Sequence, residues 1–434
     1  MHNPNTLILQ TPTAWQRFAQ PRQIVVAQHP AEVPPALQVV ETAVATHHLH
    51  AAGYLAYEAG AAFGLATHPA GPDDPPLLWF GLYDAPEVVP APPPPPADAF
   101  TLGPWQPGVD AAAYAAAIAR IKAFIAAGHT YQVNYTFPVH APFAGDAWAL
   151  FCRLAHAQQA AYTAYLDLGR HVICSASPEL FFQQDGRRLL SKPMKGTAAR
   201  GRTLAEERAN ADWLHHSEKN RAENVMIVDM IRNDIGRIAA TGSVQVPALF
   251  AIERYPTLLQ MTSTVTAETT ASLGDILAAM FPCASITGAP KKRTMDIIAE
   301  LEAGPRGVYT GAIGCLAPDG RAQFNVAIRT AIVDRARGQL TYGVGSGITW
   351  DSDAAAEYAE CGLKTRVLAH AEPPFQLLES LLWTPAAGCF LRDAHLARLA
   401  ESAEYFGFKL DETAVRAQLQ QATAALTAPA KLRL

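Results

Sequence analysis

A lysine in a basic, glycine-containing stretch is the residue of this chain best suited to covalent chemistry. The stretch reads SKPMKGTAARG from Ser191 to Gly201, and Lys192 stands three residues before Lys195. A free lysine has a pKa near 10.4, so only about one in 2,500 is neutral at pH 7. Burial, or a cation such as Lys192, would have to lower the pKa of Lys195 before it could act as a nucleophile. A solvated basic hairpin is the alternative, because the sequence does not show burial.

Four carboxylates stand where acid–base or metal chemistry is conceivable. Glu179, in SASPELFF, lies between a Ser-Pro turn and an apolar strand. If half-buried, it would have a raised pKa and could serve as a general acid. Glu223 lies in a predicted helix, and Glu357 and Glu360 are three residues apart on one face of another. Carboxylates from two helices suit Mg²⁺, which takes oxygen ligands; ordinary surface charge is the alternative for all four.

Two glycine-containing segments could bring the main chain close to a ligand. YGVGSGITW has glycines at 343, 345 and 347, which is the period of a strand. It therefore does not match the dinucleotide fingerprint, which needs GxGxxG at the start of a helix. SITGAPKKRTMDII lacks the phosphate-loop pattern, but its turn at Gly288 opens into a helix whose N–H groups could hold a carboxylate.

The elements that must position these residues are predicted to be hairpin-joined strands and outlying helices. Apolar spacing after Val109 predicts a helix that stops at Gly128, and a long helix is predicted over Leu204–Ile231. The turns at Asp185-Gly186 and Pro318–Gly320 predict hairpins. Strands are expected at Ala161–Leu168, His171–Ser175, Leu180–Gln183, Arg188–Leu190, Gly311–Leu316, Ala322–Val333 and Leu340–Gly345. This pattern predicts an α+β fold with antiparallel sheets.

Proline-rich stretches divide the chain into blocks. The run PEVVPAPPPPP (Pro86–Pro96) must be extended, because proline fixes φ and lacks an N–H, and we interpret it as a surface connector. It closes an N-terminal subdomain, residues 1–98. A linker, 99–108, and a block that carries the motifs, 109–370, follow. Residues 375–434 form a further short unit.

Composition excludes several classes of partner. The chain has 434 residues, 50% of them hydrophobic and 17% charged, with a net charge of -5, so neither nucleic acid nor a membrane surface is expected as a partner. No stretch offers about 20 uninterrupted apolar residues. The six cysteines stand singly, and the N-terminus lacks an export signal. We expect a cytoplasmic protein.

The ordered motifs identify a family. SASPEL, KPMKGT, ENVMIVDMIRNDIGR, SITGAPKKRTMDII, GVYTGAIG, FNVAIRT, YGVGSGI and EYAECGLK together resemble the chorismate-utilising enzymes, which include anthranilate, aminodeoxychorismate, isochorismate and salicylate synthases. The resemblance covers about Val109 to Leu368, with a weaker match at GYLAYEAG. It implies large antiparallel sheets packed as a sandwich with flanking helices, and a Mg²⁺-dependent conversion of chorismate by the 109–370 domain.

The resemblance also implies roles for individual residues. Glu223 and Glu360 match the Mg²⁺ ligands, and Glu357 is a neighbour that acts through water. Glu179 matches the acid that assists departure of the 4-hydroxyl of the substrate. The implied substrate contacts are Tyr309 and Arg329, which hold a carboxylate, with Thr197, Gly288, Gly345 and Gly347 around the ring. A dianionic substrate requires such a cation and arginine.

Lys195 selects the branch within this family. Anthranilate synthases generally have alanine at the matching place, whereas aminodeoxychorismate synthases have a lysine that attacks ring carbon 2 before ammonia adds at carbon 4. Gln132 stands where the water-using isochorismate and salicylate synthases have a lysine. Gln260 stands where relatives often have histidine, which disfavours anthranilate synthase. The implied function is aminodeoxychorismate synthesis, in the pathway to para-aminobenzoate and folate; anthranilate synthase and a non-catalytic scaffold are the alternatives.

The partner and the tail follow from the same resemblance. The chain shows no nucleophile-elbow cysteine with a downstream histidine, so ammonia is expected from a separate glutamine amidotransferase. Residues 375–434 resemble the start of aminodeoxychorismate lyase, a class IV pyridoxal-phosphate enzyme, with His395 and Arg398 in its HxxRL motif. An amphipathic helix is the alternative. The Schiff-base lysine of that family would lie beyond Leu434, so no pyridoxal phosphate is expected here.

Overall fold

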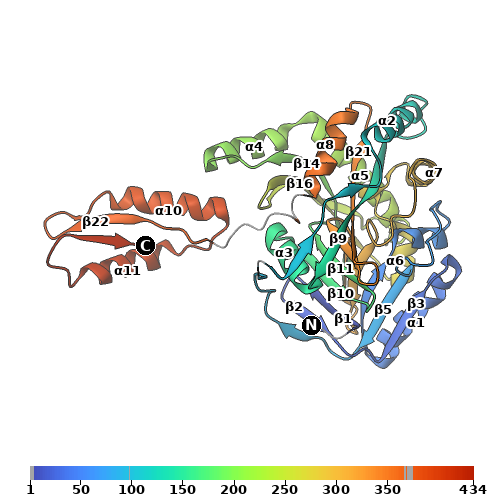
Figure 1. The fold of residues 1–434 in the computed structure, drawn as a ribbon, viewed down its shortest axis with the longest axis horizontal. Helices are drawn as coiled ribbons and strands as arrows, with labels where there is room; N and C mark the ends of the chain where they lie inside the picture. Colours follow the sequence, from blue (N-terminus) through green and yellow to red (C-terminus); the bar gives the residue numbers. More distant parts are fainter. Residues whose placement is uncertain (1–3, 97, 366–367, 369–374) are drawn as a thin grey trace.

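Two large antiparallel sheets form the body of the molecule (Figure 1). The computed structural model describes residues 4–96, 98–365, 368 and 375–434. The first sheet has eleven strands, the second has ten, and a three-stranded sheet lies in the C-terminal unit, which projects from one side of the body. The predicted α+β class is confirmed.

The first sheet is built around the long strand β9. In spatial order its strands are β17 (Gly288–Ala289), β9 (Gln132–Gly145), β21 (Gln339–Ile348), β20 (Thr330–Asp334), β11 (His171–Ser177), β10 (Tyr162–Asp167), β1 (Thr6–Gln10), β2 (Trp15–Phe18) and β6 (Glu87–Val89). Two short strands, β7 (Phe100–Leu102) and β8 (Gln106–Pro107), also pair with β9. The expected linker thus contributes strands to this sheet.

The second sheet carries the predicted hairpins. Its order is β14 (Met194–Ala199), β16 (Leu258–Glu268), β13 (Arg188–Lys192), β12 (Leu180–Asp185), β19 (Ala322–Val326), β18 (Ala312–Leu316), β4 (His50–Leu55), β5 (Leu78–Tyr83) and β3 (Gln23–Ala27), with β15 (Gln245–Arg254) on β16. The hairpins at Asp185-Gly186 and Pro318–Gly320 are confirmed. Strands that precede residue 98 pair with later strands in both sheets.

Alternation along the strands produces the layers. In β1, Leu7 and Leu9 belong to a buried cluster with Tyr54 and Ile313 of the second sheet, which fills the space between the sheets. Ile8 points the other way and joins the cluster beneath the helices, because successive side chains of a strand face opposite sides. The sheets therefore form a sandwich with helices on the outside.

Helices cover the two outer faces. They are α1 (Val33–His47), α2 (Ala111–Ala126), α3 (Ala147–Gln158), α4 (Leu204–His216), α5 (Glu218–Gly236), α6 (Leu273–Met280), α7 (Lys291–Leu301) and α8 (Ala354–Lys364), with short 3₁₀ turns at Pro30–Glu32, Tyr57–Phe63 and Ala284–Ile286. Buried side chains of α1, α5 and α6 pack on the second sheet, and those of α2 and α3 on the first. None of the helices within the described ranges is long and apolar enough to cross a membrane.

Two predicted elements were wrong. The single helix over Leu204–Ile231 is two helices, because Ser217 takes an extended conformation and its side chain caps α5 by accepting from the N–H of Asn220. The single strand over Ala322–Val333 is also two, β19 and β20, and they belong to different sheets. The chain crosses between sheets at Arg329, whose φ is 51°.

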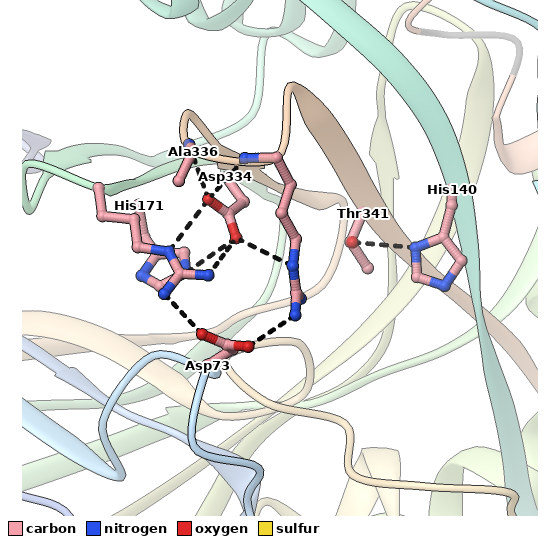
Figure 2. Close-up of polar contacts among 8 residues, drawn as sticks. Asp73, His140, His171, Asp334, Ala336 and Thr341 are labelled. Carbon is pink, nitrogen blue, oxygen red and sulfur yellow. Dashed lines mark hydrogen bonds and ion pairs between the residues drawn. The ribbon is translucent and has the colours of Figure 1, made fainter.

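One end of the first sheet is fastened by ion pairs (Figure 2). Asp334, at the end of β20, accepts from Nε and Nη2 of Arg170 and from the N–H of Ala336. Asp73, from the loop before β5, accepts from Arg170 and Arg337. The charged groups of this end thus hold one another, and the pKa of Asp334 is lowered to about 2 chiefly by its bond to Arg170.

The C-terminal unit is small. Its strands are β22 (Ser380–Thr384), β23 (Gly388–Cys389) and β24 (Ala430–Arg433), and its helices are α10 (Arg392–Phe406) and α11 (Glu412–Thr423). The hydroxyl of Tyr405 in α10 donates to the carbonyl of Gly201 near the start of α4. The expected boundary at residue 370 lies outside the described residues.

Candidate active site

Lys195 lies on β14, where two side-chain amides hold the main chain around it. Asn224 of α5 donates to the Lys195 carbonyl at 3.3 Å, and Gln260 of β16 donates to the Gly196 carbonyl at 2.9 Å. Gly196 has φ of 97°, a conformation that favours glycine. The turn of KPMKGT is therefore fixed by neighbours on both sides, and Gln260, noted as a departure from relatives, contributes to holding it.

The Lys195 ammonium ends against the bare backbone of β21. A Cβ placed on Gly347 would lie 2.6 Å from Lys195 Nζ, 2.6 Å from Gln132 Nε2 and 3.1 Å from Asn134 Oδ1. Only glycine leaves room for these three groups. Gln132 Oε1 and Asn134 Nδ2 are buried and have no hydrogen-bond partner. Buried polar atoms are normally paired, so the two atoms without partners make this corner a candidate ligand site.

Burial lowers the pKa of Lys195, and Lys364 acts in the same direction. Glu223, Glu179 and Glu357 oppose the shift, although no ion pair joins Lys195 to any of them in the described part of the chain. The expectation that Lys192 would lower the pKa of Lys195 was wrong. Lys192 forms an ion pair with Glu253 instead of facing Lys195.

Glu179 follows β11 and is buried close to Lys195. Burial raises its pKa to about 7, while Ser285, Lys195 and the main chain of Met194 lower it. One carboxylate oxygen, Oε1, has no hydrogen-bond partner. A carboxyl with this pKa is substantially protonated near neutral pH, so Glu179 has the property that a general acid needs.

Arg329 lies where the chain crosses between the sheets, and Tyr309 lies in the segment just before β18. The guanidinium of Arg329 bonds to the neutral Gln158 side chain, and no ion pair joins it to a carboxylate among the described residues. Burial lowers the pKa of Arg329. The ring of Tyr309 packs on Gly343, where a Cβ would lie 2.2 Å from it. Arg329 is half-buried, and removing part of a guanidinium from water without an anion is costly, which favours a carboxylate ligand here.

The other predicted substrate contacts, Gly288, Gly345 and Thr197, lie on strands of the two sheets. Gly288 has φ of 147° and pairs with Val133 on β9, and a Cβ there would lie 2.0 Å from the Gln132 carbonyl. Gly345 packs closely against the Tyr135 carbonyl of β9. Thr197 is exposed on β14, opposite Gln260.

The three predicted metal carboxylates come from α5 and α8. Glu223 and Glu357 are half-buried and act electrostatically on Lys195, whereas Glu360 is exposed and pairs with Lys364 at 2.9 Å. Within the described residues, no three side chains of His, Cys, Asp or Glu meet closely enough to hold a metal by themselves. Magnesium commonly takes one or two carboxylates plus substrate oxygens and waters, and these oxygen donors fit that chemistry.

Sequence reasoning missed Lys364 and Asn134. Lys364 Nζ donates to the Gly345 carbonyl at 2.7 Å, so it brings a cation to the glycine-lined strand. It stands in the quoted EYAECGLK motif, four residues after Glu360, and this helical spacing was the available signal. Asn134 is two residues after Gln132 on β9, and strand periodicity places both on one face.

The tail motif has a structural explanation. Arg398 donates from Nε and Nη2 to the two oxygens of Glu379, each at 2.6 Å, and His395 bonds to Glu379 at 2.7 Å. A cavity of about 660 Å³ lies between β23, α10 and α11. Its charged residues Arg392, Asp393 and Arg416 pair with one another. Because the charged residues of this cavity already pair with one another, we place the candidate site at Lys195 and not in the C-terminal unit.

Comparison with known proteins places the body in a family. Residues 4–370 match the family model of chorismate binding enzymes. Aminodeoxychorismate synthase component 1 of Salmonella typhimurium is 41% identical over 268 residues, which cover 61% of this chain and 59% of that relative. Anthranilate synthase component 1 of Thermus thermophilus is 40% identical over 262 residues, which cover 60% of this chain and 56% of the relative. The matches thus span less than two thirds of either relative.

Solved structures share the fold. Anthranilate synthase component I from Streptococcus pneumoniae superposes with a TM-score of 0.68 at 24% identity, covering 85% of this chain and 91% of that one. The menaquinone-specific isochorismate synthase from Escherichia coli gives a TM-score of 0.70 at 17% identity, covering 84% and 89%. At these identities the likeness shows the fold alone. The tail lies outside the matched family model, and its likeness to a lyase stays a prediction.

Proposed function

The chain belongs to the chorismate-binding enzyme family, and we propose that within it the chain is an aminodeoxychorismate synthase subunit, which converts chorismate and ammonia to 4-amino-4-deoxychorismate. The proposal includes the 109–370 block as its catalytic domain, 1–98 as an associated subdomain, and a cytoplasmic location. Similarity to aminodeoxychorismate and anthranilate synthases is nearly equal, so residues of the site must decide the branch.

The observation that carries the proposal is the setting of Lys195. Its amine reaches the glycine-lined face of β21, and burial lowers its pKa. A lowered pKa increases the fraction of neutral amine, which is the nucleophilic form. This setting supports Lys195, the lysine that distinguishes this branch of the family, as the nucleophile of the proposed reaction.

The proposed reaction has two displacements. The neutral Lys195 amine forms a bond to ring carbon 2, the two conjugated ring double bonds shift toward carbon 4, and the 4-hydroxyl leaves as water with a proton from Glu179. Ammonia then bonds to carbon 4, the two double bonds shift back, and the Lys195 amine leaves carbon 2. The proton that the new amine loses returns to Glu179. One water is released for each ammonia incorporated. The raised pKa of Glu179, about 7, favours the protonated carboxyl that the first step needs.

Binding of the dianionic substrate would rest on Arg329, Tyr309 and the metal. Arg329, which has no carboxylate partner among the described residues, would pair with a substrate carboxylate, and Tyr309 would donate to it. Glu223 and Glu360 would hold Mg²⁺, with Glu357 acting through water. When bound, the cation would neutralise carboxylate charge on the substrate.

Ammonia is proposed to come from a glutamine amidotransferase subunit. The name of the Salmonella relative, component 1, supports a second component. Gln132 supports ammonia as the nucleophile, since it supplies a neutral amide where water-using relatives have a lysine. Its buried Oε1 lacks a partner and could accept from an N–H of ammonia.

Product analysis tests the function. The purified chain, given chorismate, Mg²⁺ and an ammonium salt, should release a product with the mass of aminodeoxychorismate, without added pyridoxal phosphate. Anthranilate with pyruvate would instead assign the chain to the anthranilate branch, and no turnover would favour a scaffold. Glutamine should replace ammonium only when an amidotransferase is added.

A further inference from the structure

Arg306 is a buried arginine with every donor in use. Its side chain is 2% exposed, and a guanidinium has five N–H donors. Nε and Nη2 donate to the two oxygens of Glu302 at 2.8 and 2.7 Å, and Nη2 also donates to the Asn134 carbonyl at 2.7 Å. Nη1 donates to the Ile286 carbonyl at 2.9 Å and to the Thr310 hydroxyl at 3.4 Å.

The acceptors of Arg306 come from segments that border the candidate site. Asn134 contributes its side chain to the corner beside Lys195 Nζ, and Ile286 follows Ser285, which bonds to Glu179. Thr310 follows Tyr309. One guanidinium thus joins three stretches, at Asn134, Ile286 and Thr310, that border the site.

Glu302 extends the same hold to β9. Its Oε1 accepts from the N–H and the hydroxyl of Thr136, at 2.8 and 3.0 Å, in addition to the bond from Arg306. Strand β9 is therefore held at two residues, Asn134 and Thr136, by one buried ion pair. A carboxylate that accepts several charged or main-chain donors is satisfied and rigid.

The N-terminal block fixes Arg306 in turn. Glu58, 2% exposed, accepts from the N–H groups of Arg306 and Gly307 at 2.7 and 3.0 Å. The ring of Tyr57 lies 4.4 Å from the guanidinium carbon, a cation–π contact. The GYLAYEAG motif, which no substrate contact explains, thus has a role in supporting this arginine.

We propose that Arg306, with Glu302, is a positioning residue for the reaction: it sets β9 at Asn134–Thr136 against the Ile286 and Tyr309 segments, and thereby sets the surroundings of Lys195. The inference rests on the proposed function, and it adds to it the group that holds the site together. Arg306 itself touches no reacting atom in this account.

Arg306→Lys tests the fork geometry, because lysine keeps the charge but offers three donors from one nitrogen. Misplacement of site groups by a fraction of an ångström to 1 Å can cost about 100-fold in rate, so kcat for ammonium-dependent turnover should fall by about that factor, more than KM for chorismate changes. Glu302→Gln, which keeps the shape, is the second variant and should fall by about tenfold or more. Circular dichroism and Tm would establish that each variant is folded.

Arg170→Lys is the matched control. Arg170 makes a similar two-point contact with Asp334, but it lies just before β11, whereas Glu179 of the site follows the other end of that strand. The Arg170→Lys variant should have a lower Tm without a comparable loss of kcat. A kcat for Arg306→Lys and Glu302→Gln within about threefold of wild type, or an equal loss in Arg170→Lys, would overturn the positioning role.

A second readout is independent of chorismate. The pH dependence of amine labelling at Lys195 by acetic anhydride, read by peptide mass spectrometry, should shift to higher pH in Arg306→Lys and stay in place in Arg170→Lys, because a displaced β9 admits water to the amine. If the wild type makes no aminodeoxychorismate, the proposed function fails and labelling alone decides the positioning role: an unchanged profile in Arg306→Lys would contradict it.

Discussion

The two ends of the first sheet differ in whether their polar groups have bonding partners. At the end drawn in Figure 2, Asp334 and Asp73 are paired with arginines, and the pKa of Asp334 is lowered to about 2. At the other end of the same sheet, on β9, Gln132 Oε1 and Asn134 Nδ2 are buried without hydrogen-bond partners. We call these the fastened end and the open end.

The comparison separates scaffold from site. Buried polar groups are normally satisfied within a protein, so the fastened end needs no ligand to explain it. The open end keeps a half-buried Arg329 with no carboxylate partner among the described residues, and it adjoins Glu179, whose pKa burial raises to about 7. Groups left unsatisfied, with pKa values moved toward neutrality, are characteristic of functional sites. The difference teaches that charge alone would not separate the two ends, since both carry several charged groups.

The largest expected effect is at Lys195, on the open end. Lys195→Ala should lower aminodeoxychorismate formation from ammonium by about 10³-fold or more, because the covalent route is closed. The variant has alanine where anthranilate synthases have it, so slow formation of anthranilate is an expected side product. Steady-state assays with mass detection measure both, and wild-type rates in this variant would remove the nucleophile from the account.

Glu179→Gln should have the next largest effect. Loss of a general acid costs about 10²–10⁴-fold in rate. Glu179 must be protonated to act, so the wild-type kcat/KM should fall as pH rises above about 7, following the pKa of this carboxyl in the free enzyme. The glutamine variant cannot lose that proton, and its pH profile should lack this alkaline limb. A limb that persists would assign it to another group.

Glu223→Gln and Glu360→Gln test the metal assignment. Each removes a charged oxygen donor, so activity should fall by at least about tenfold and calorimetric Mg²⁺ affinity should weaken. Glu218→Gln, an exposed acid on the same helix as Glu223, is the control. Unchanged Mg²⁺ affinity in either variant would exclude that residue as a ligand.

The smallest effect on turnover should come from the fastened end. Asp334→Asn should cost about 1–3 kcal/mol in the free energy of unfolding near pH 7, because charged hydrogen bonds are lost, while kcat stays close to wild type. The lowered pKa of Asp334 means that its contribution is present above pH about 4 and is lost as pH falls through about 2. The difference in unfolding free energy between wild type and variant should therefore shrink in acid. A large loss of kcat would break the comparison between the two ends.

Much of this molecule could be predicted from sequence, because its motifs and hairpins are local signals. The Asp185-Gly186 turn and the strands beside it needed only short-range pattern. The crossing at Arg329 could not be predicted, since the segment Ala322–Val333 contains no Gly or Pro to mark a break and only tertiary structure divides it between sheets. The helix break at Ser217 was readable as a cap but was masked by good helix formers on both sides.

The site was predictable in its members and not in its electrostatics. The family motifs nominated Lys195 and Glu179, yet the neighbour expected to lower the lysine pKa, Lys192, pairs with Glu253. Burial, the other expected cause, lowers it, and the cation that contributes is Lys364; both effects depend on how the chain packs around Lys195. Long-range contacts of this kind are invisible to spacing.

Intact-protein and peptide mass spectrometry of the wild type with chorismate and Mg²⁺, in the absence of ammonia, tests the central claim most directly. The account predicts an adduct equal in mass to chorismate less one water, mapped to Lys195, absent from Lys195→Ala and discharged when ammonium is added. Rapid ammonium-dependent turnover with no adduct at Lys195 under any quench condition would contradict it, and Lys195 would then be an electrostatic contact of the open end.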